Sequence, residues 1–268
     1  MNAHIFREYD IRGVVGKDLS PELARDIGRG FGTLIRREGG RTAAVGRDCR
    51  LSSPELAAAV VEGLCDAGCD VHVLGMTPTP VLYFNAYRLE TAGALQLTGS
   101  HNPPDFNGFK MMMRDRAIYG ADIQSIRHMI EARDFETGQG QVITHGDAVS
   151  TYVDWLGEHG QMGEHPVKVV VDGGNGAGGP TTIAALERLG VEVIPMFCEP
   201  DGHFPNHHPD PTIPENISLL RDRVLAEGAD FGVGLDGDGD RIGVVDGGGE
   251  TLWGDKLMII FSRDILRQ

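Results

Sequence analysis

The chain has 268 residues, a length typical of about two domains, each with enough residues for its own hydrophobic core. Its formal net charge of -15 at pH 7 argues against nucleic acids and anionic membranes as partners, because both bind basic patches. No apolar run approaches the roughly 18 residues of a membrane helix, and residues 1–10 do not resemble a signal peptide. The four cysteines include no CxxC pair. We therefore expect a cytoplasmic protein, and an anionic substrate is compatible with its charge.

The first half of the chain predicts alternating helices and strands. A helix is expected to begin at Ser20-Pro21, because serine is a favoured helix cap and proline a favoured first residue. Further helices are expected at 52–68, 79–89 and 122–133, and strands at 42–46, 70–74, 92–97 and 108–113. This alternation is typical of right-handed βαβ crossovers in a mainly parallel sheet. The methionines 111–113 indicate that the last of these strands is buried on both faces.

The second half of the chain predicts another cycle of the same kind. Residues 136–150 are rich in Gly, Gln and Thr and have no period, so we place the domain boundary there. Helices are expected beyond it at 152–159, 181–189, 217–227 and 255–266, and strands at 167–172, 191–196 and 229–235. The predicted fold class is α/β, with two consecutive α/β/α domains whose mixed sheets are mainly parallel. We assign residues 1–147 and 148–252 to these domains and residues 253–268 to a separate helix.

Residues 98–104, Thr-Gly-Ser-His-Asn-Pro-Pro, are predicted to form a loop at the carboxyl end of a strand. Pro103 and Pro104 remove backbone donors, and Gly99 lets the chain bend just before Ser100. Open α/β sheets usually carry their chemistry at the carboxyl ends of strands. Ser100 is therefore a candidate nucleophile. The alternative is a proline-rich turn without chemistry.

Asp236, Asp238 and Asp240 alternate with glycines and precede Arg241. Carboxylates at every second residue can converge on one point, and because they repel one another, convergence implies a cation or raised pKa values. Oxygen ligands suit a hard ion such as Mg²⁺. A calcium-binding EF-hand loop starting at Asp236 would need glycine sixth and glutamate twelfth, where this chain has Arg241 and Gly247. The alternative is a solvated Asp-Gly turn between two strands.

Two other segments resemble ligand sites in part. Residues 173–179 contain the pattern G-x-G-x-x-G between a predicted strand and a predicted helix, as dinucleotide-binding folds do. Glu199 or Asp201 could supply the acidic residue that such a site needs, so a dinucleotide-binding oxidoreductase domain is the alternative function. Tight turns into helices use the same glycines for packing alone. The histidines of residues 203–211 lack a third ligand at zinc spacing, and we interpret that segment as a structural loop.

Four segments, in their order and separation, resemble the α-D-phosphohexomutases and among them the bacterial phosphomannomutase/phosphoglucomutase type. They are Tyr9-Asp10-Ile11-Arg12-Gly13 and residues 98–110, 204–211 and 236–241. The resemblance extends over the entire chain. Members of that family have four domains around a central cleft. The resemblance thus implies that this chain holds the first two domains, that residues 253–268 open the third, and that the rest of the third and the fourth are missing.

The resemblance implies an isomerase of carbohydrate metabolism that works by phosphoryl transfer. It would interconvert the 1- and 6-phosphates of mannose or glucose through a phosphoserine and a hexose 1,6-bisphosphate intermediate. Ser100 would carry the phosphoryl group and would join Asp236, Asp238 and Asp240 as ligands of one Mg²⁺ ion. Glucose 1,6-bisphosphate is the implied activator.

The resemblance also assigns roles to five further residues. Lys110 would be the general acid and base at the sugar hydroxyl, and Arg12 and Arg241 would supply positive charge to the phosphate groups. His101 would support catalysis, and Tyr9 would join Arg12, Lys110 and Arg241 in binding the substrate. The sugar-selecting loop of the third domain and the phosphate-binding loop of the fourth are absent from this chain. We therefore expect it to bind Mg²⁺ but to have little or no mutase activity alone.

Overall fold

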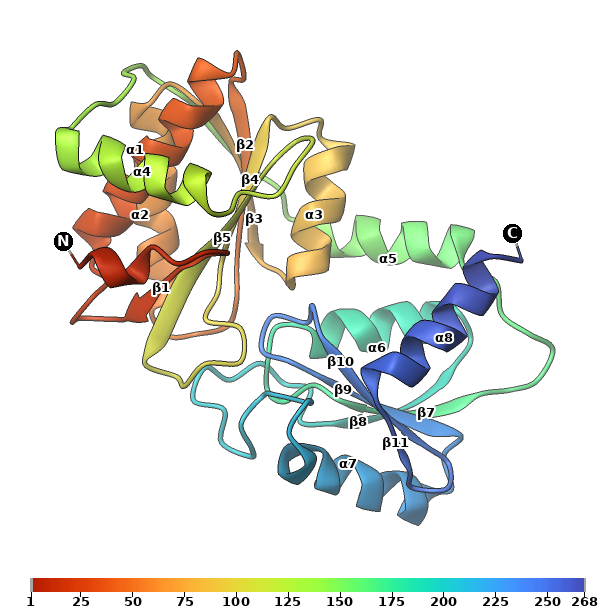
Figure 1. Ribbon diagram of the computed structural model, residues 1–268. Helices are drawn as coiled ribbons and strands as arrows, with labels where there is room; N and C mark the ends of the chain where they lie inside the picture. The colour runs from red at the N-terminus through yellow and green to blue at the C-terminus, as the bar shows by residue number, and fades with distance from the viewer. Residues whose placement is uncertain (1, 268) are drawn as a thin grey trace. The chain divides into compact units, whose positions relative to one another are not determined.

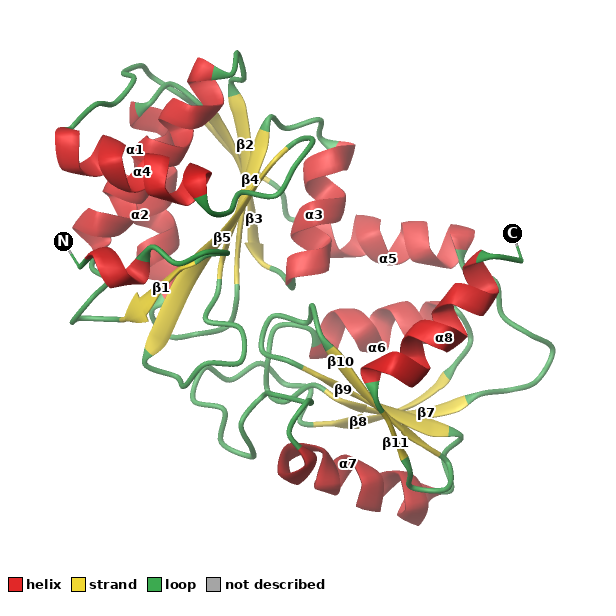
Figure 2. Cartoon of the chain, in the orientation of Figure 1, coloured by secondary structure: helices red, strands yellow, loops and turns green. Residues whose placement is uncertain are grey.

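A computed structural model describes residues 2–267 and divides the chain into two compact α/β units (Figures 1 and 2). Unit 1 consists of Met1–Tyr152 and Asp201–His203, and unit 2 consists of Val153–Pro200 and Phe204–Gln268. The division between Tyr152 and Val153 falls inside a helix, α5 (Ala148–His159). Within residues 2–267, no helix combines the length and the apolar character needed to span a membrane.

Unit 1 is built on a six-stranded mixed sheet. Its strands are β1 (Ile11–Val14), β2 (Thr42–Arg47), β3 (Asp70–Met76), β4 (Gly93–Leu97), β5 (Phe106–Met113) and β6 (Val142–Thr144). They lie in the order β1-β5-β4-β2-β3-β6. The strands from β4 to β6 in this order are parallel, whereas β5 runs antiparallel to both of its neighbours. The mainly parallel mixed sheet predicted from the sequence is therefore present.

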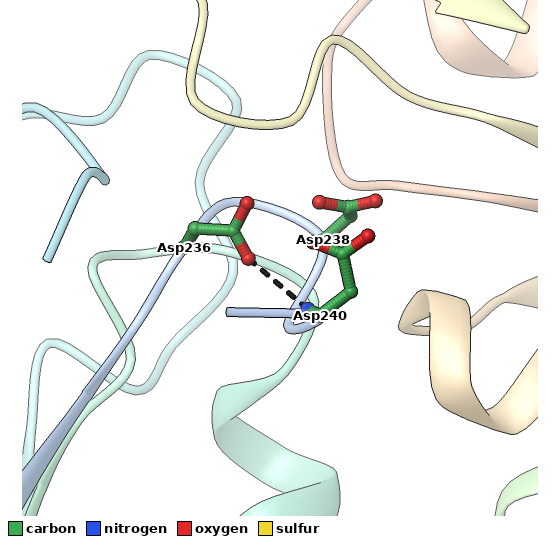
Figure 3. A group of neighbouring side chains, drawn as sticks. All are labelled: Asp236, Asp238 and Asp240. Atoms are coloured by element: carbon green, nitrogen blue, oxygen red, sulfur yellow. Dashed lines mark hydrogen bonds between the residues drawn. The ribbon is translucent and has the colours of Figure 1, made fainter. Parts of the chain in front are cut away.

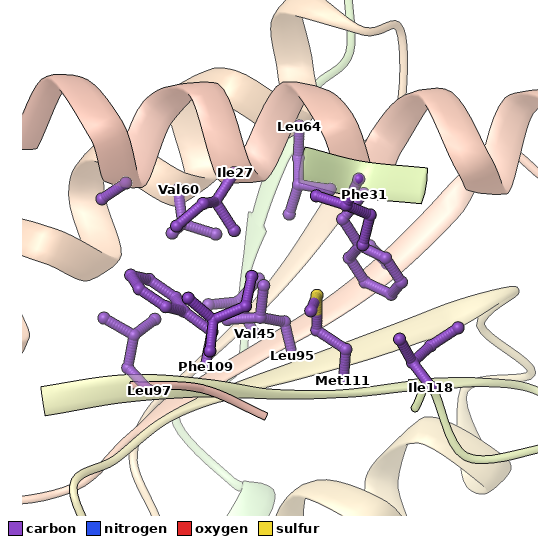
Figure 4. Close-up of a cluster of buried hydrophobic side chains, with 14 of the residues drawn as sticks. Ile27, Phe31, Val45, Val60, Leu64, Leu95, Leu97, Phe109, Met111 and Ile118 are labelled. Atoms are coloured by element: carbon purple, nitrogen blue, oxygen red, sulfur yellow. The ribbon is translucent and has the colours of Figure 1, made fainter. Parts of the chain in front are cut away.

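Helices cover both faces of this sheet. Figure 1 shows α1 (Pro21–Arg37), α2 (Ser53–Asp66) and α4 (Ala121–Ala132) on one face and α3 (Thr79–Arg88) on the other, and a short 3-10 helix, η1 (Ala3–Ile5), precedes β1. The larger apolar core lies between the sheet and the three helices (Figure 4). Met111 and Met113 pack into this core, whereas Met112 packs against the cluster on the α3 face. The prediction that the methionine strand is buried on both faces is confirmed.

The first long helix begins where its sequence predicts. Ser20 caps α1 by accepting a hydrogen bond from the backbone N–H of Leu23 at 3.3 Å, and Pro21 is the first helical residue. α1 then crosses α2 at very short range, because glycines stand at the contact. A Cβ atom at Gly63 would lie only 2.1 Å from the carbonyl oxygen of Arg25. The two helices therefore touch backbone to backbone.

Unit 2 is built on a five-stranded mixed sheet. Its strands are β7 (Lys168–Asp172), β8 (Glu192–Met196), β9 (Phe231–Leu235), β10 (Ile242–Asp246) and β11 (Thr251–Leu252), in the order β11-β10-β9-β7-β8. β7 is parallel to β8 and β9, and β10 is antiparallel to β9 and β11. Of the helices α6 (Gly179–Arg188), α7 (Pro214–Glu227) and α8 (Gly254–Ile265), the first two cover opposite faces of the sheet (Figure 1). Val169 and Val171 pack towards α6, and Val170 packs towards α7.

Four strands do not appear among the elements expected from the sequence. β1 lies in a charged segment at the start of the chain for which no strand is predicted, and β6 lies in the stretch assigned to the domain boundary. β10 and β11 form a hairpin after the aspartate loop. Residues of β6 are all exposed, and β1 has only four residues, with Arg12 and Gly13 between its two apolar ones, so neither carries the apolar pattern that marks a buried strand.

Candidate active site

The Ser100 loop joins β4 to β5 at the carboxyl end of β4, as predicted. Ser100 has a φ of 49°, in the left-handed region, and its backbone N–H donates to Thr98 Oγ1 at 2.8 Å. Asn102 closes the turn, since its backbone N–H donates to the carbonyl oxygen of Gly99 at 2.9 Å. The hydroxyl oxygen of Ser100 lies 3.2 Å from His101 Nδ1. His101 is therefore the side chain placed to exchange a proton with the Ser100 hydroxyl.

Arg12 and Lys110 lie on the same face of the unit 1 sheet. Ile11 and Phe109 face each other in register and point into the core beneath α1 and α2. Because side chains alternate along a strand, Arg12 and Lys110 point to the opposite face. The cationic side chains of Arg12 and Lys110 thus lie on one face of the sheet, and the Lys110 amine can carry a proton.

The environment of Arg12 suits an anionic ligand. Its guanidinium forms an ion pair with Asp10, and the side chain is 11% exposed. Among the described residues, Arg12 Nε is a buried donor without a hydrogen-bond acceptor. A phosphate oxygen would satisfy such a donor. Tyr9, in contrast, is 78% exposed.

The three predicted metal ligands converge in unit 2 (Figure 3). Asp236, Asp238 and Asp240 each offer one carboxylate oxygen, and these oxygens lie within 4.8 Å of one another. The turn is tight because Asp236 Oδ1 accepts hydrogen bonds from the backbone N–H groups of Asp240 and Arg241, both at 3.1 Å. Gly239 has a φ of 69°, which this turn requires. The side chain of Arg241 is exposed at the end of the same loop.

The glycine loop of residues 173–179 packs against the aspartate loop instead of forming an open phosphate cradle. The backbone N–H of Ala177 donates to the carbonyl oxygen of Gly237 at 3.0 Å. A Cβ atom at Gly176 would lie 2.7 Å from that same oxygen, so only glycine allows this approach. The glycine loop therefore packs directly against the backbone of the aspartate loop.

The backbone donors of the glycine loop are also engaged. The N–H groups of residues 173–177 all donate to oxygen atoms of the chain, at distances between 2.7 and 3.0 Å. A dinucleotide-binding loop presents such groups to a pyrophosphate. This geometry disfavours the dinucleotide-binding alternative and favours the packing role of the glycines.

His203 and His207 pair with different carboxylates. His207 Nε2 lies 2.9 Å from Asp172 Oδ2, and His207 Nδ1 lies 2.9 Å from the carbonyl oxygen of His208. His203 Nδ1 pairs with Asp201 at 2.8 Å within unit 1. Among the described residues these histidines belong to no group of three potential metal ligands.

The Asp172–His207 pair should make unit 2 more stable below neutral pH. Burial lowers the pKa of His207, but the hydrogen bond and charge of Asp172, with the carbonyl of His208, outweigh it and raise the pKa above its usual value. The stabilisation is then complete below a pH of about 6.5 and is lost as pH rises through the raised pKa. We expect His207→Gln to reduce the free energy of unfolding more at pH ~6 than at pH ~8.5.

Chemical denaturation at both pH values measures this difference. His203→Gln is the matched control. The side chain of His203 is 68% exposed, so its ion pair with Asp201 is solvated and should contribute little to stability at either pH. An equal effect of His207→Gln at both pH values would contradict the inference that a protonated His207 pairs with Asp172.

Comparison with known proteins identifies the family. Residues 3–137 match the family model described as phosphoglucomutase/phosphomannomutase, alpha/beta/alpha domain I, and residues 149–249 match the model of domain II. The chain belongs to the phosphoglucomutase/phosphomannomutase family. The resemblance inferred from the sequence motifs and the prediction of two α/β/α domains are confirmed. Ser100 and Lys110 lie within the domain I match, and the three aspartates lie within the domain II match.

Individual relatives agree with this family. The chain is 47% identical to the phosphomannomutase/phosphoglucomutase of Pseudomonas aeruginosa over 98% of its own length and 57% of that protein. It is 40% identical to the phosphoglucomutase of Neisseria gonorrhoeae, again over 98% of its own length and 57% of that protein. The crystal structure of a phosphoglucomutase/phosphomannomutase family protein from Burkholderia thailandensis superimposes with a TM-score of 0.96 and 42% identity, covering 100% of this chain and 60% of that one. The chain thus spans somewhat more than half the length of these relatives.

Sequence reasoning missed two residues next to the Ser100 loop, Asp48 and Arg50. Both are fully buried at the carboxyl end of β2, and Arg50 Nη2 donates to the carbonyl oxygen of Ser100 at 2.9 Å. Nothing in the sequence singles them out, because charged residues after a strand usually lie in an exposed loop and are rarely buried.

Proposed function

We propose that the chain supplies the phosphoryl-transfer groups of a phosphohexomutase, which interconverts hexose 1-phosphates and hexose 6-phosphates of mannose or glucose. The observation that carries the proposal is the convergence of three carboxylates on one loop, in a chain whose relatives are named phosphomannomutase/phosphoglucomutase. A serine hydroxyl beside a histidine, on a separate loop of domain I, supports it.

In the proposed reaction, the phosphoryl group moves from Ser100 to a hydroxyl of the hexose monophosphate. The P–O bond to the serine oxygen breaks and a P–O bond to the sugar oxygen forms. The sugar hydroxyl gives its proton to the neutral amine of Lys110, and the serine oxygen takes up a proton, for which His101 is the adjacent group. The product, a hexose 1,6-bisphosphate, turns round, and Ser100 recovers the other phosphoryl group by the reverse steps. Glucose 1,6-bisphosphate is the compound expected to load Ser100.

The aspartate loop fits one Mg²⁺ ion, because its convergent donors are all oxygens and magnesium prefers oxygen ligands. Asp236, Asp238 and Asp240 would hold the ion, which would neutralise charge on the phosphoryl group when bound. Arg12 would bind a phosphate of the substrate through its buried Nε donor. Arg241 and Tyr9 have exposed side chains, and their roles in substrate binding stay predictions, as does an Mg²⁺ contact by Ser100.

We also propose that residues 253–268 open a third domain. The support is that α8 exposes most of its large apolar side chains, namely Met258, Ile259, Ile260, Phe261 and Ile265. In this proposal, selection of the sugar and much of its binding depend on domains beyond these residues. Little or no turnover of glucose 1-phosphate is then expected from the 268-residue chain.

Mass spectrometry tests the proposed nucleophile. The chain is incubated with glucose 1,6-bisphosphate and Mg²⁺, and its intact mass and peptide map are compared before and after. We expect one phosphoryl group, localised to Ser100 and absent from Ser100→Ala. Localisation to His101 would demand a different mechanism.

A magnesium titration tests the metal loop independently of phosphoryl transfer. Mg²⁺ at a hundredfold excess over Kd should stabilise the wild-type chain by about 2.7 kcal/mol. Asp238→Asn should abolish this stabilisation. Asp246→Asn is the matched control, because Asp246 organises the neighbouring turn by accepting from Gly248 and Glu250 and lies outside the cluster. Equal stabilisation of Asp238→Asn and wild type would contradict the proposed metal loop.

A further inference from the structure

The backbone of the Ser100 loop adopts a conformation that needs external support. Ser100 has a φ of 49°, and residues other than glycine rarely occupy this region. Such a conformation persists only where several contacts hold it. Pro103 and Pro104 stiffen the loop but offer no N–H groups for hydrogen bonds. Much of the support must therefore come from another segment of unit 1.

One buried guanidinium group supplies most of this support. Arg50 lies just after β2 and has no exposed side-chain surface. It donates to the backbone carbonyl oxygens of three loop residues, namely Ser100 at 2.9 Å, Asn102 at 2.6 Å and Pro103, and to that of Phe106, the first residue of β5, at 3.0 Å. A single rigid group thus holds the loop from Ser100 to the start of β5. Its planar fork of donors suits this task, which a lysine ammonium cannot reproduce.

Asp48 fixes the guanidinium and also contacts the loop directly. Its Oδ2 accepts from Arg50 Nε at 3.1 Å and from the backbone N–H of Gly99 at 3.2 Å. Its Oδ1 accepts from the backbone N–H of Arg50 at 3.0 Å and from Ser53 Oγ at 2.5 Å. The backbone of Gly99 approaches the guanidinium closely, since a Cβ atom there would be 2.5 Å from Arg50 Cζ and Nε. The pair and the loop form one hydrogen-bonded cluster.

We propose that Arg50, oriented by Asp48, is a positioning residue that holds Ser100 in place to accept and release a phosphoryl group. The inference rests on the proposed function, in which Ser100 is the nucleophile. Phosphoryl transfer depends chiefly on the position of the reacting groups, so a small displacement of the hydroxyl is costly. Arg50 donates to backbone carbonyls of Ser100, Asn102, Pro103 and Phe106, whereas the cations expected to bind phosphate would contact the ligand itself.

The test compares Arg50→Lys with wild type in the rate of Ser100 phosphorylation by glucose 1,6-bisphosphate and Mg²⁺. We expect the maximal rate to fall about a hundredfold, as displacement of a reacting group by about 1 Å can do, with little change in KM for the bisphosphate. Amide hydrogen exchange of residues 98–106 should accelerate, whereas exchange in the rest of unit 1 should not change. A merely structural role would not separate the rate from KM in this way.

Arg47→Lys is the matched control, because Arg47 donates to the carbonyl oxygen of Asp48, and within residues 2–267 no hydrogen bond or ion pair joins its side chain to residues 98–106. It should load Ser100 within about twofold of wild type, well inside the effect expected from displacement. A wild-type rate in a folded Arg50→Lys would overturn the proposal.

A second variant decides the case in which Arg50→Lys does not fold. Gly99→Ala keeps the Asp48–Arg50 pair and displaces it from the loop through the added methyl group. The same selective loss of rate and of loop protection would support the proposal, and unchanged values would overturn it. If the wild-type chain accepted no phosphoryl group, the proposed function would fail and with it the role in transfer. Loop exchange in Arg50→Lys would still show whether Arg50 holds the loop.

Discussion

Replacing Gly63 by alanine should lower the free energy of unfolding of unit 1 by about 3 kcal/mol, the upper end for overpacking a core. The added Cβ would lie 2.1 Å from the carbonyl oxygen of Arg25 and 2.9 Å from the backbone nitrogen of Arg29. Both are backbone atoms of α1, so no side chain can move aside, and the two helices must separate. Alanine favours the helix by only about 1 kcal/mol, which offsets a minor part of this cost.

Thermal and chemical denaturation of the chain measure this effect. A loss of 3 kcal/mol corresponds to a fall in Tm of about 6 to 12 °C for a unit of this size. Gly254→Ala is the matched control, because Gly254 is the first residue of α8 and a Cβ there would meet nothing within 4 Å. A change below about 1 kcal/mol in Gly63→Ala, the size typical of ordinary substitutions, would contradict the backbone contact between α1 and α2.

Elements with a strong local pattern were predictable from the sequence. Ser20 and Pro21 mark the start of α1 with a cap and a favoured first residue, and both act as expected. The apolar run of residues 167–172 predicts a strand, and β7 occupies Lys168–Asp172. The convergence of the three aspartates could be predicted because they lie within five consecutive residues, and their role as metal ligands stays a prediction. Each of these predictions depends only on neighbours in the sequence.

Features that depend on distant segments were not predictable. β1 becomes a strand because it pairs with β5, and its four residues, with Arg12 and Gly13 at the centre, are too few to show this. Arginine side chains mostly lie at the surface, and the carbonyl groups that accept hydrogen bonds from Arg50 come about 50 residues later in the chain. The glycines of residues 173–179 fit both a dinucleotide-binding loop and a tight turn that packs into a helix until their neighbours are known. The packing of residues 236–240 against them favours the second interpretation.

Replacing Gly176 by alanine should weaken Mg²⁺ binding by about 10- to 100-fold, the range found for groups that support metal ligands. A Cβ atom at position 176 would lie 2.7 Å from the carbonyl oxygen and 2.9 Å from the Cα of Gly237. Gly237 separates Asp236 from Asp238, so its displacement moves two proposed ligands relative to each other. Gly176 is not among the glycines with a positive φ, so alanine fits the backbone and the effect comes from this contact alone.

Isothermal titration with Mg²⁺ measures the affinity, and Gly163→Ala is the matched control. Gly163 also lies in unit 2 without a positive φ, and a Cβ there would meet nothing within 4 Å, so wild-type affinity is expected. Titration with NAD separates the two interpretations of the glycine loop. If the loop supports the aspartates, NAD should not bind, and Gly176→Ala should affect only Mg²⁺. NAD binding that Gly176→Ala abolishes, with Mg²⁺ affinity unchanged, would instead restore the dinucleotide-binding function, because the loop would then contact a ligand and not Gly237.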